Sequence, residues 1–193
     1  MLPCTRRVSS VAPGEAMLIG LDPLLAGDAL AVLRDMGHGD SVAVVDANFP
    51  AQFLGPPVIR LDCDIVRAGR AILSLMPLDA FVEAPLVRME VIGRPGEIVA
   101  AQAEFLAMVE NVAGPGWPAG SLERFAFYEA ARDCVAIFAT LDRRAYANFI
   151  LVKGVLGADD AVVRSGPGTI AAPRDMARRG PAVARPASRG GRR

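Results

Sequence analysis

The sequence predicts a single α/β domain with a central mixed sheet flanked by helices. Apolar runs of strand length alternate with segments that have the spacing of amphipathic helices. The chain has 193 residues, which is enough for one domain with a hydrophobic core and too few for two domains of ordinary size. Although 52% of the residues are hydrophobic, the longest apolar run, residues 134–141, falls far short of the roughly 18 residues of a membrane helix. We therefore expect no membrane segment.

The first predicted elements are a short helix and a buried strand. Residues 28–36 have apolar side chains at helical spacing, with Asp28 as the cap and Gly37 as the stop. Residues 41–45 are mostly apolar, as in a strand buried on both faces. Asp46 comes next and therefore lies at the carboxyl end of a strand, where open α/β sheets commonly bind ligands.

The middle of the chain continues the alternation. Residues 58–61 form a short strand that leads to a helix, which Asp64 caps and Pro77 bounds. Residues 86–92 alternate well enough for a second strand. A Pro-Gly-Glu sequence then begins a helix that we expect over residues 95–110, because its apolar positions return at helical spacing.

The final third begins with a helix over residues 123–133. Arg124 and Tyr128 are four residues apart, so they share one face of this helix. Phe127 and Ala131 have the same spacing and share another face. The helix therefore presents a polar face and an apolar one.

Two strands close the domain. Residues 134–140 and 146–152 are separated by a turn, which predicts a hairpin-like arrangement. The two-residue period of a strand places Tyr146 and Asn148 on the same side. Ala147 faces away, but its backbone groups remain available to a ligand.

The two ends of the chain differ from the middle. Residues 1–16 and 157–193 are rich in small residues and proline, lack hydrophobic periodicity and are expected to be disordered, which leaves residues 17–156 as the folded domain. Cys63 and Cys134 lie in apolar or strand-like surroundings and are most simply free thiols. Free thiols favour a reducing compartment, and no secretory signal is evident, so we expect a cytoplasmic protein.

His38 is the single histidine of the chain. One imidazole cannot form a multi-histidine metal site, but it is the side chain best suited to acid–base chemistry near neutral pH. Glycines on both sides let the backbone bend tightly and leave room for a ligand beside the ring. Asp46 could orient this ring or accept hydrogen bonds from a ligand. His38 is therefore the candidate catalytic residue.

Four short motifs follow one another along the chain. They are Gly-His-Gly-Asp at 37–40, Asp-Ala-Asn-Phe-Pro at 46–50, Arg-Phe-Ala-Phe-Tyr-Glu at 124–129, and Tyr-Ala-Asn at 146–148 with Lys-Gly-Val at 153–155. Together, at these spacings, they resemble the small bacterial fucose mutarotase and ribose pyranase family over about residues 17–155. The Arg124 and Tyr128 element resembles the fucose branch, whereas Tyr-Ala-Asn is the form typical of the ribose branch.

The resemblance implies an α/β fold, a ring-shaped homo-oligomer that is typically a decamer, and a sugar pocket near subunit contacts, with no cofactor or metal. It implies that His38 is the catalytic proton donor. The residues expected to contact the sugar are Asp46, Arg124, Tyr128, Tyr146, Ala147 and Asn148. Exchange of sugar anomers needs two proton movements and no redox step, so one positioned histidine suits this reaction.

Several other interpretations are open. The same residues fit a D-ribose pyranase, or a monosaccharide-binding protein without catalytic activity. The arginine-rich end could bind nucleic acid, which we rank last. A purely structural interpretation is open for several of these residues. In it, His38 ends a helix, Asp46 caps a turn, Arg124 pairs with a neighbouring glutamate, and Tyr146 is an ordinary strand residue. Trp117, in a loop over residues 114–118, could stack on a sugar or pack locally.

Overall fold

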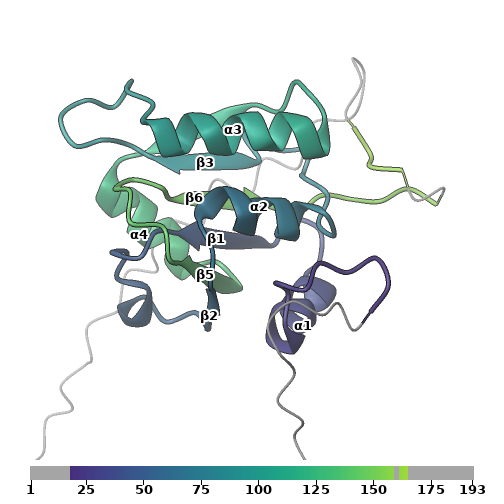
Figure 1. The fold of residues 1–193 in the computed structure, drawn as a ribbon. Coiled ribbons are helices and arrows are strands. Elements are labelled where there is room, and N and C mark those ends of the chain that lie inside the picture. Colours follow the sequence, from purple (N-terminus) through teal and green to yellow (C-terminus); the bar gives the residue numbers. More distant parts are fainter. Residues whose placement is uncertain (1–17, 159–160, 165–193) are drawn as a thin grey trace, which may run out of the picture.

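The computed structural model describes residues 18–158 and 161–164, and all structural statements refer to them (Figure 1). The elements in chain order are α1 (Gly27–Asp35), β1 (Ser41–Val45), the 3-10 helix η1 (Ala51–Phe53), β2 (Val58–Leu61), α2 (Ile65–Leu73), β3 (Leu86–Met89), α3 (Ala100–Ala113), β4 (Ala119–Leu122), α4 (Arg124–Arg132), β5 (Ala136–Thr140) and β6 (Phe149–Val152). Within this part of the chain, no helix is long and apolar enough to cross a membrane.

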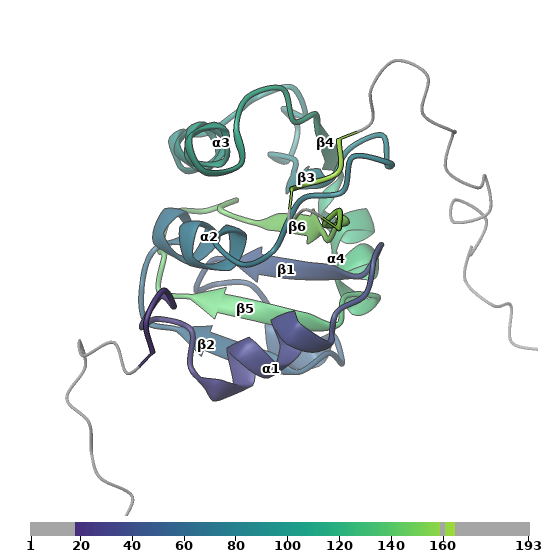
Figure 2. The ribbon, with the colours of Figure 1, turned by 90° about the vertical axis from the view of Figure 1, so that its right-hand side faces the viewer.

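The strands form one six-stranded mixed sheet, which confirms the predicted fold class. Their order across the sheet is β2-β5-β1-β6-β3-β4, and Figure 2 shows them stacked in this order. β6 pairs antiparallel with both of its neighbours, whereas all other pairs are parallel. The carboxyl ends of five strands and the amino end of β6 therefore meet at one edge of the sheet. We call this the carboxyl edge, and the opposite one the amino edge.

The core lies on both faces of the sheet, because side chains alternate along each strand. Val42 and Val44 of β1 pack with the apolar faces of α1, α2 and α3. Ala43 and Val45 point the other way and pack with Phe127 of α4. Because both faces of β1 are covered, this strand is continuously apolar in sequence.

The bounds of β1 and β2 agree with the prediction, and so does the start of α2. The Asp64 side chain accepts a hydrogen bond from the backbone N–H of Arg67 at 2.8 Å, as an N-cap residue should. Asp28 is not a cap, which corrects the prediction for α1. That helix begins at Gly27 after Ala26, and Asp28 lies in its first turn, where an acidic side chain still interacts favourably with the helix dipole.

Two predictions for the middle of the chain need correction. The helix expected from residue 95 begins only at Ala100, because the Arg88 guanidinium donates to the carbonyls of Pro95 and Glu97 and holds that segment as a loop. β3 ends at Met89 instead of residue 92. β4 was not predicted, because its Ala-Gly-Ser-Leu sequence has no strand-like run of apolar or β-branched residues.

The predicted hairpin of the last two strands is wrong. β1 lies between β5 and β6 and pairs with both of them. Residues 1–16 and most of 157–193, for which we expect disorder, lie outside the described residues. The described residues beyond 156 fold back on the domain, since the N–H of Val163 donates to the carbonyl of Val155 at 3.0 Å.

Candidate functional site

Three of the predicted sugar-binding residues lie at the carboxyl edge. Asp46 directly follows β1, as the sequence predicts. Arg124 is the first residue of α4, which begins just after β4. Asn148 directly precedes β6, whose reversed direction brings its amino end to the same edge.

Asp46 and Asn148 form a buried, mutually hydrogen-bonded pair. The backbone N–H of Asp46 donates to Oδ1 of Asn148 at 2.9 Å, and Nδ2 of Asn148 donates to Oδ2 of Asp46 at 2.8 Å. The other Asp46 oxygen accepts from the N–H of Asn48. Burial raises the pKa of Asp46, although hydrogen bonds from Asn48 and Asn148 oppose this. The pair is thus a rigid acceptor and donor group at the end of β1.

The backbone before Asn148 is not a strand. Tyr146 has a φ of 64°, the only positive φ of a non-glycine residue in the described part of the chain. β6 begins at Phe149, so the prediction that Tyr146 and Asn148 share one side of a strand is wrong. Ala147 between them is fully buried, backbone included, and its N–H donates to the carbonyl of Arg144, so the expected access of a ligand to its backbone is not seen in a single copy.

Tyr128 and Arg124 flank this region from α4. The Tyr128 ring packs edge-on against Phe49, with centroids 5.3 Å apart, and the N–H of Phe49 donates to the carbonyl of Asp46. The Arg124 guanidinium lies over the Phe125 ring, 4.4 Å from its centroid. The buried Nε of Arg124 has no hydrogen-bond partner among the described residues.

The ion pair considered for Arg124 does not form. The Glu123 carboxylate accepts from the backbone N–H groups of Phe125 and Ala126 as the N-cap of α4. Glu129 pairs with Arg132 at 3.4 Å. Arg124 therefore keeps its hydrogen-bond donors for a ligand.

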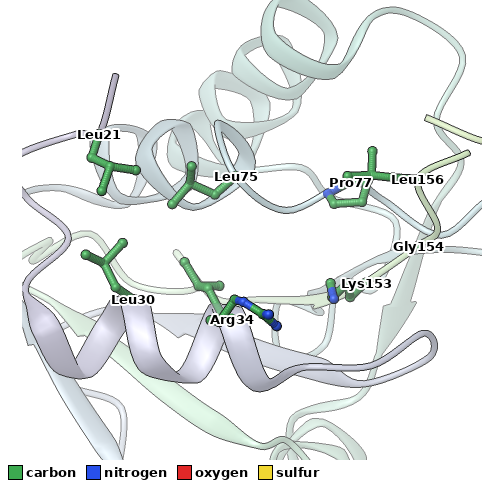
Figure 3. A pocket seen from close by; sticks show the side chains of 9 residues that line it. Leu21, Leu30, Arg34, Leu75, Pro77, Lys153, Gly154 and Leu156 are labelled. Atoms are coloured by element: carbon green, nitrogen blue, oxygen red, sulfur yellow. The ribbon is translucent and has the colours of Figure 1, made fainter. Parts of the chain in front are cut away.

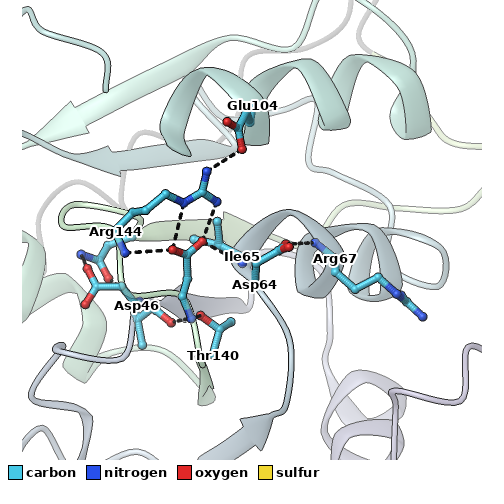
Figure 4. A network of polar contacts seen from close by, with 10 residues as sticks. Asp46, Asp64, Ile65, Arg67, Glu104, Thr140 and Arg144 are labelled. Carbon is cyan, nitrogen blue, oxygen red and sulfur yellow. Dashed lines mark hydrogen bonds and ion pairs between the residues drawn. The ribbon is translucent and has the colours of Figure 1, made fainter. Parts of the chain in front are cut away.

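A network of polar contacts holds the loops at the carboxyl edge in place (Figure 4). Arg144 binds Asp142 with two guanidinium nitrogens, at 3.0 and 2.7 Å, and reaches Glu104 of α3 at 2.6 Å. The Asp142 carboxylate also accepts from the N–H of Ile65, and its carbonyl accepts from the N–H of Ala47. Burial alone would raise the pKa of Asp142, but the hydrogen bonds from Arg144 and Ile65 lower it below its usual value. This network fixes the loops that carry Asp46 and Asn148.

His38 lies at the amino edge and is oriented by Asp79. The imidazole Nε2 is 3.2 Å from Oδ2 of Asp79, and the His38 side chain is 50% exposed whereas that of Asp79 is 1% exposed. The other Asp79 oxygen accepts from the N–H of Phe81, whose ring packs edge-on against the imidazole at 5.5 Å. The suggestion that Asp46 orients His38 is wrong. Asp79 was missed because it is 41 positions away in sequence and belongs to none of the motifs.

Backbone hydrogen bonds hold the His38 and Asp79 segments together. The N–H of Gly39 donates to the carbonyl of Lys153 at 2.9 Å, and the N–H of Asp79 donates to the carbonyl of Val152 at 3.0 Å. Both segments are thus attached to the end of β6. The Lys-Gly-Val motif gains a structural role from this arrangement.

The predicted site residues form two separate groups. One is the His38–Asp79 pair at the amino edge, and the other is the carboxyl-edge cluster, which consists of Asp46, Arg124, Tyr128, Tyr146, Ala147 and Asn148. Between them lies the whole length of β1, about 13 Å for its five residues at about 3.3 Å per step. The structure therefore brings the residues that we predicted to bind the sugar together, but leaves His38 apart from them.

Each of the two groups has a residue in the lining of a separate cavity. A cavity of about 440 Å³ has Asp46, Phe49 and Arg60 in its lining, and one of about 210 Å³ has Asp79 and Trp117. Trp117 also donates to the carbonyl of Ala113, which supports its local packing role.

Another cavity, of about 510 Å³, lies between α1 and the segments that follow α2 and β6 (Figure 3). Its lining is mainly leucine, with Arg34 and Lys153 at one end. None of the predicted site residues lines it.

Cys63 and Cys134, the two cysteines in the described part of the chain, do not contribute to a metal-binding group. Burial is the main reason why the pKa values of Cys63 and Cys134 are raised to about 11, so both thiols are protonated at neutral pH. Both are free, as the sequence predicts. Among the described residues, no group of three or more His, Cys, Asp or Glu side chains could hold a metal ion.

Comparison with known proteins agrees with this fold. The chain belongs to the RbsD / FucU transport protein family, whose model matches residues 19–156. It is 38% identical over 140 residues to an L-fucose mutarotase of Glaesserella parasuis serovar 5 (strain SH0165), which covers 72% of this chain and 96% of that one.

Two solved structures share the fold. The fucose mutarotase from Streptococcus pneumoniae, in complex with L-fucose, is 33% identical with a TM-score of 0.67, and the match covers 72% of this chain and all of that one. RbsD of Bacillus subtilis, complexed with D-ribose, has a TM-score of 0.54 over 69% of this chain and 95% of that one. At 22% identity, it supports the fold alone.

Proposed function

We propose that this protein is a cofactor-independent mutarotase that interconverts the α and β anomers of L-fucose or a related deoxyhexose. The observation that carries the proposal is the His38–Asp79 pair, a half-exposed imidazole held by a buried carboxylate. The L-fucose mutarotases to which the chain is similar support the choice of sugar.

The chemistry follows from the groups. The ring oxygen gains a proton as its bond to the anomeric carbon breaks, and the anomeric hydroxyl loses one as the open-chain aldehyde forms. Rotation of the aldehyde and closure on its other face reverse both proton movements. Asp79 accepts a hydrogen bond from Nε2 of His38, which leaves Nδ1 to exchange a proton with the sugar. Such positioned acid–base catalysis typically contributes about 10²–10⁴-fold.

The carboxyl-edge cluster binds the sugar in this proposal. The Asp46–Asn148 pair offers acceptors and a donor to the hydroxyls, and Arg124 adds unpaired donors. Tyr128 and Tyr146 add hydroxyls and flat faces for the C–H surface of the ring. Asp46 and Asn148 are buried and hydrogen-bonded to each other before the sugar arrives, which lowers the entropic cost of binding.

Because β1 separates the two groups, one monosaccharide cannot contact both within a single copy. We therefore infer a homo-oligomer in which His38 and Asp79 of one copy complete the carboxyl-edge cluster of another. Large exposed apolar side chains near this cluster support such a contact: Phe53, Phe125 and Leu141 are 85%, 61% and 60% exposed. The family resemblance suggests a decameric ring, and the free thiols favour a cytoplasmic location.

Magnetisation exchange in NMR tests the reaction directly. We expect the protein to accelerate exchange between the anomers of L-fucose more than the ring-size exchange of D-ribose. The reverse order would make it a ribose pyranase. Saturable fucose binding without acceleration would make it a binding protein and overturn the proposal.

Mixing two variants tests the shared site. His38→Ala and Asp46→Asn chains are each expected to be inactive, but mixed oligomers formed by refolding them together contain sites with both native groups. We expect the mixture to recover part of the activity. No recovery, in mixtures shown by mass spectrometry to contain both chains, would contradict the shared site.

A further inference from the structure

The backbone at Tyr146 is held in a conformation that its side chain disfavours. A left-handed backbone is unfavourable for a non-glycine residue, because Cβ approaches the following carbonyl oxygen. Tyr146 nevertheless has a φ of 64°. Such conformations persist only where the surrounding structure enforces them, and they gather at ligand-binding segments. Something must therefore hold this segment in place.

The group that holds it is the side-chain amide of Gln102, on α3. Its Nε2 donates to the carbonyl of Tyr146 at 2.9 Å and to the carbonyl of Met89 at 2.7 Å. Gln102 is completely buried, so both hydrogen bonds are shielded from water. The orientation of the amide is unambiguous, because two carbonyl acceptors require both N–H groups.

The second acceptor connects Gln102 with the other end of the same segment. The N–H of Met89 donates to the carbonyl of Asn148 at 3.1 Å, and Nδ2 of Asn148 lies 3.8 Å from the Met89 sulfur. Gln102 thus holds the segment on both sides, directly at Tyr146 and through Met89 at Asn148. Because Asn148 in turn binds Asp46, the amide fixes a large part of the carboxyl-edge cluster.

The side-chain amide of Gln102 also destabilises the folded state through one of its atoms, so its presence at this position is not explained by stability alone. Its Oε1 is buried and has no hydrogen-bond partner among the described residues. An unpaired buried acceptor destabilises the folded state, and such features in native proteins commonly have a functional reason. The functional reason that we infer for Gln102 is its two donated hydrogen bonds, which hold the Tyr146–Asn148 segment.

We propose that Gln102 is a positioning residue for sugar binding, which sets the conformation of Tyr146, Ala147 and Asn148 before the sugar arrives. The inference rests on the proposed role of this segment as part of the sugar site. Gln102 does not contact the sugar itself. It carries no charge, and its hydrogen bonds go to Met89 and Tyr146 and not to His38 or Asp79. Loss of the amide should therefore weaken binding without changing the pH dependence of catalysis.

The test compares Gln102→Leu with Gln102→Met, both of which remove the two donors. Gln102→Met keeps the unbranched shape and serves if the leucine variant does not fold. Val109→Ala is the matched control, because Val109 is equally buried on α3 and the change opens a cavity away from the segment. Asn148→Ala reports on the sugar site itself. Calorimetric titration with L-fucose gives the Kd, and anomer exchange gives the pH profile.

We expect the Kd for L-fucose to rise about tenfold or more in both Gln102 variants, as for the loss of one to two buried hydrogen bonds. The pH profile should stay unchanged, and Val109→Ala should lower the thermal stability but leave the Kd as it is. A normal Kd in the Gln102 variants, with weakened binding in Asn148→Ala, would overturn the positioning role alone. A normal Kd in Asn148→Ala would overturn the sugar site and the positioning role together.

Discussion

Gly154 lies so close to the segment carrying Asp79 that one added methyl group should disturb the His38–Asp79 pair, to which we assign the acid–base step. A Cβ at this position would lie 2.2 Å from the carbonyl oxygen of Leu78 and 2.9 Å from Cα of Asp79. Ordinary contact begins at 3.4 Å, so Gly154→Ala must move backbone by about 1 Å. Because the bond from His38 to Asp79 is already 3.2 Å long, a shift of this size would break it.

The expected effects of Gly154→Ala are a loss of stability of about 1–3 kcal/mol, as for other overpacked sites, and a drop in the fucose exchange rate of roughly 10²-fold, as for a misplacement of about 1 Å. Thermal unfolding and NMR exchange measure the two effects. Gly27→Ala is the control: its Cβ would meet nothing within 4 Å, and it begins α1, so it should be neutral or slightly stabilising. A destabilised Gly154→Ala variant that exchanges fucose at the normal rate would refute the orienting role of Asp79.

Three further predictions concern single side chains. Arg124→Met should weaken fucose binding about tenfold in calorimetric titration. The midpoint of thermal unfolding should stay unchanged, since Arg124 makes no ion pair among the described residues. A lowered midpoint would indicate a structural role. Asp142→Asn should lower the stability at pH 7 by about 1–3 kcal/mol, and urea unfolding at several pH values checks it. Because the pKa of Asp142 is lowered from 3.8, its stabilisation is present above that pH and lost as the pH falls through the folded-state pKa, so the difference between variant and wild type should shrink in acid. In a Cys4→Ser chain at neutral pH, the buried Cys134 should react with a disulfide reagent only after unfolding, and the half-buried Cys63 should react slowly, because the pKa values of both thiols are raised to about 11. Rapid reaction of the folded chain would be inconsistent with these raised pKa values.

Local sequence signals predicted the elements with continuous apolar runs or clear caps. β1 and β2 have their predicted bounds, and Asp64 caps α2, because these features depend on neighbouring residues alone. The pairing of strands depends on distant parts of the chain. β5 and β6 are close in sequence and look like a hairpin, but β1 occupies the place between them.

The same distinction applies to the site. The placement of Asp46 after β1 could be predicted from the strand before it. The residues that orient the site, Asp79 and Gln102, could not be predicted from the sequence, because each is a single residue that belongs to no motif. Only the folded chain brings them to His38 and Tyr146. The left-handed backbone of Tyr146 was hidden for the same reason, because Gln102 enforces it from another helix.

In the proposed mechanism, His38 performs the acid–base step of anomer exchange in L-fucose. This role can be measured directly by NMR magnetisation exchange between the two anomers of L-fucose, with wild-type protein and with His38→Ala at equal concentration. We expect strong acceleration by the wild type and only the uncatalysed rate with His38→Ala, although the variant still binds fucose and unfolds at a similar temperature. Undiminished exchange in a folded His38→Ala protein would contradict this role.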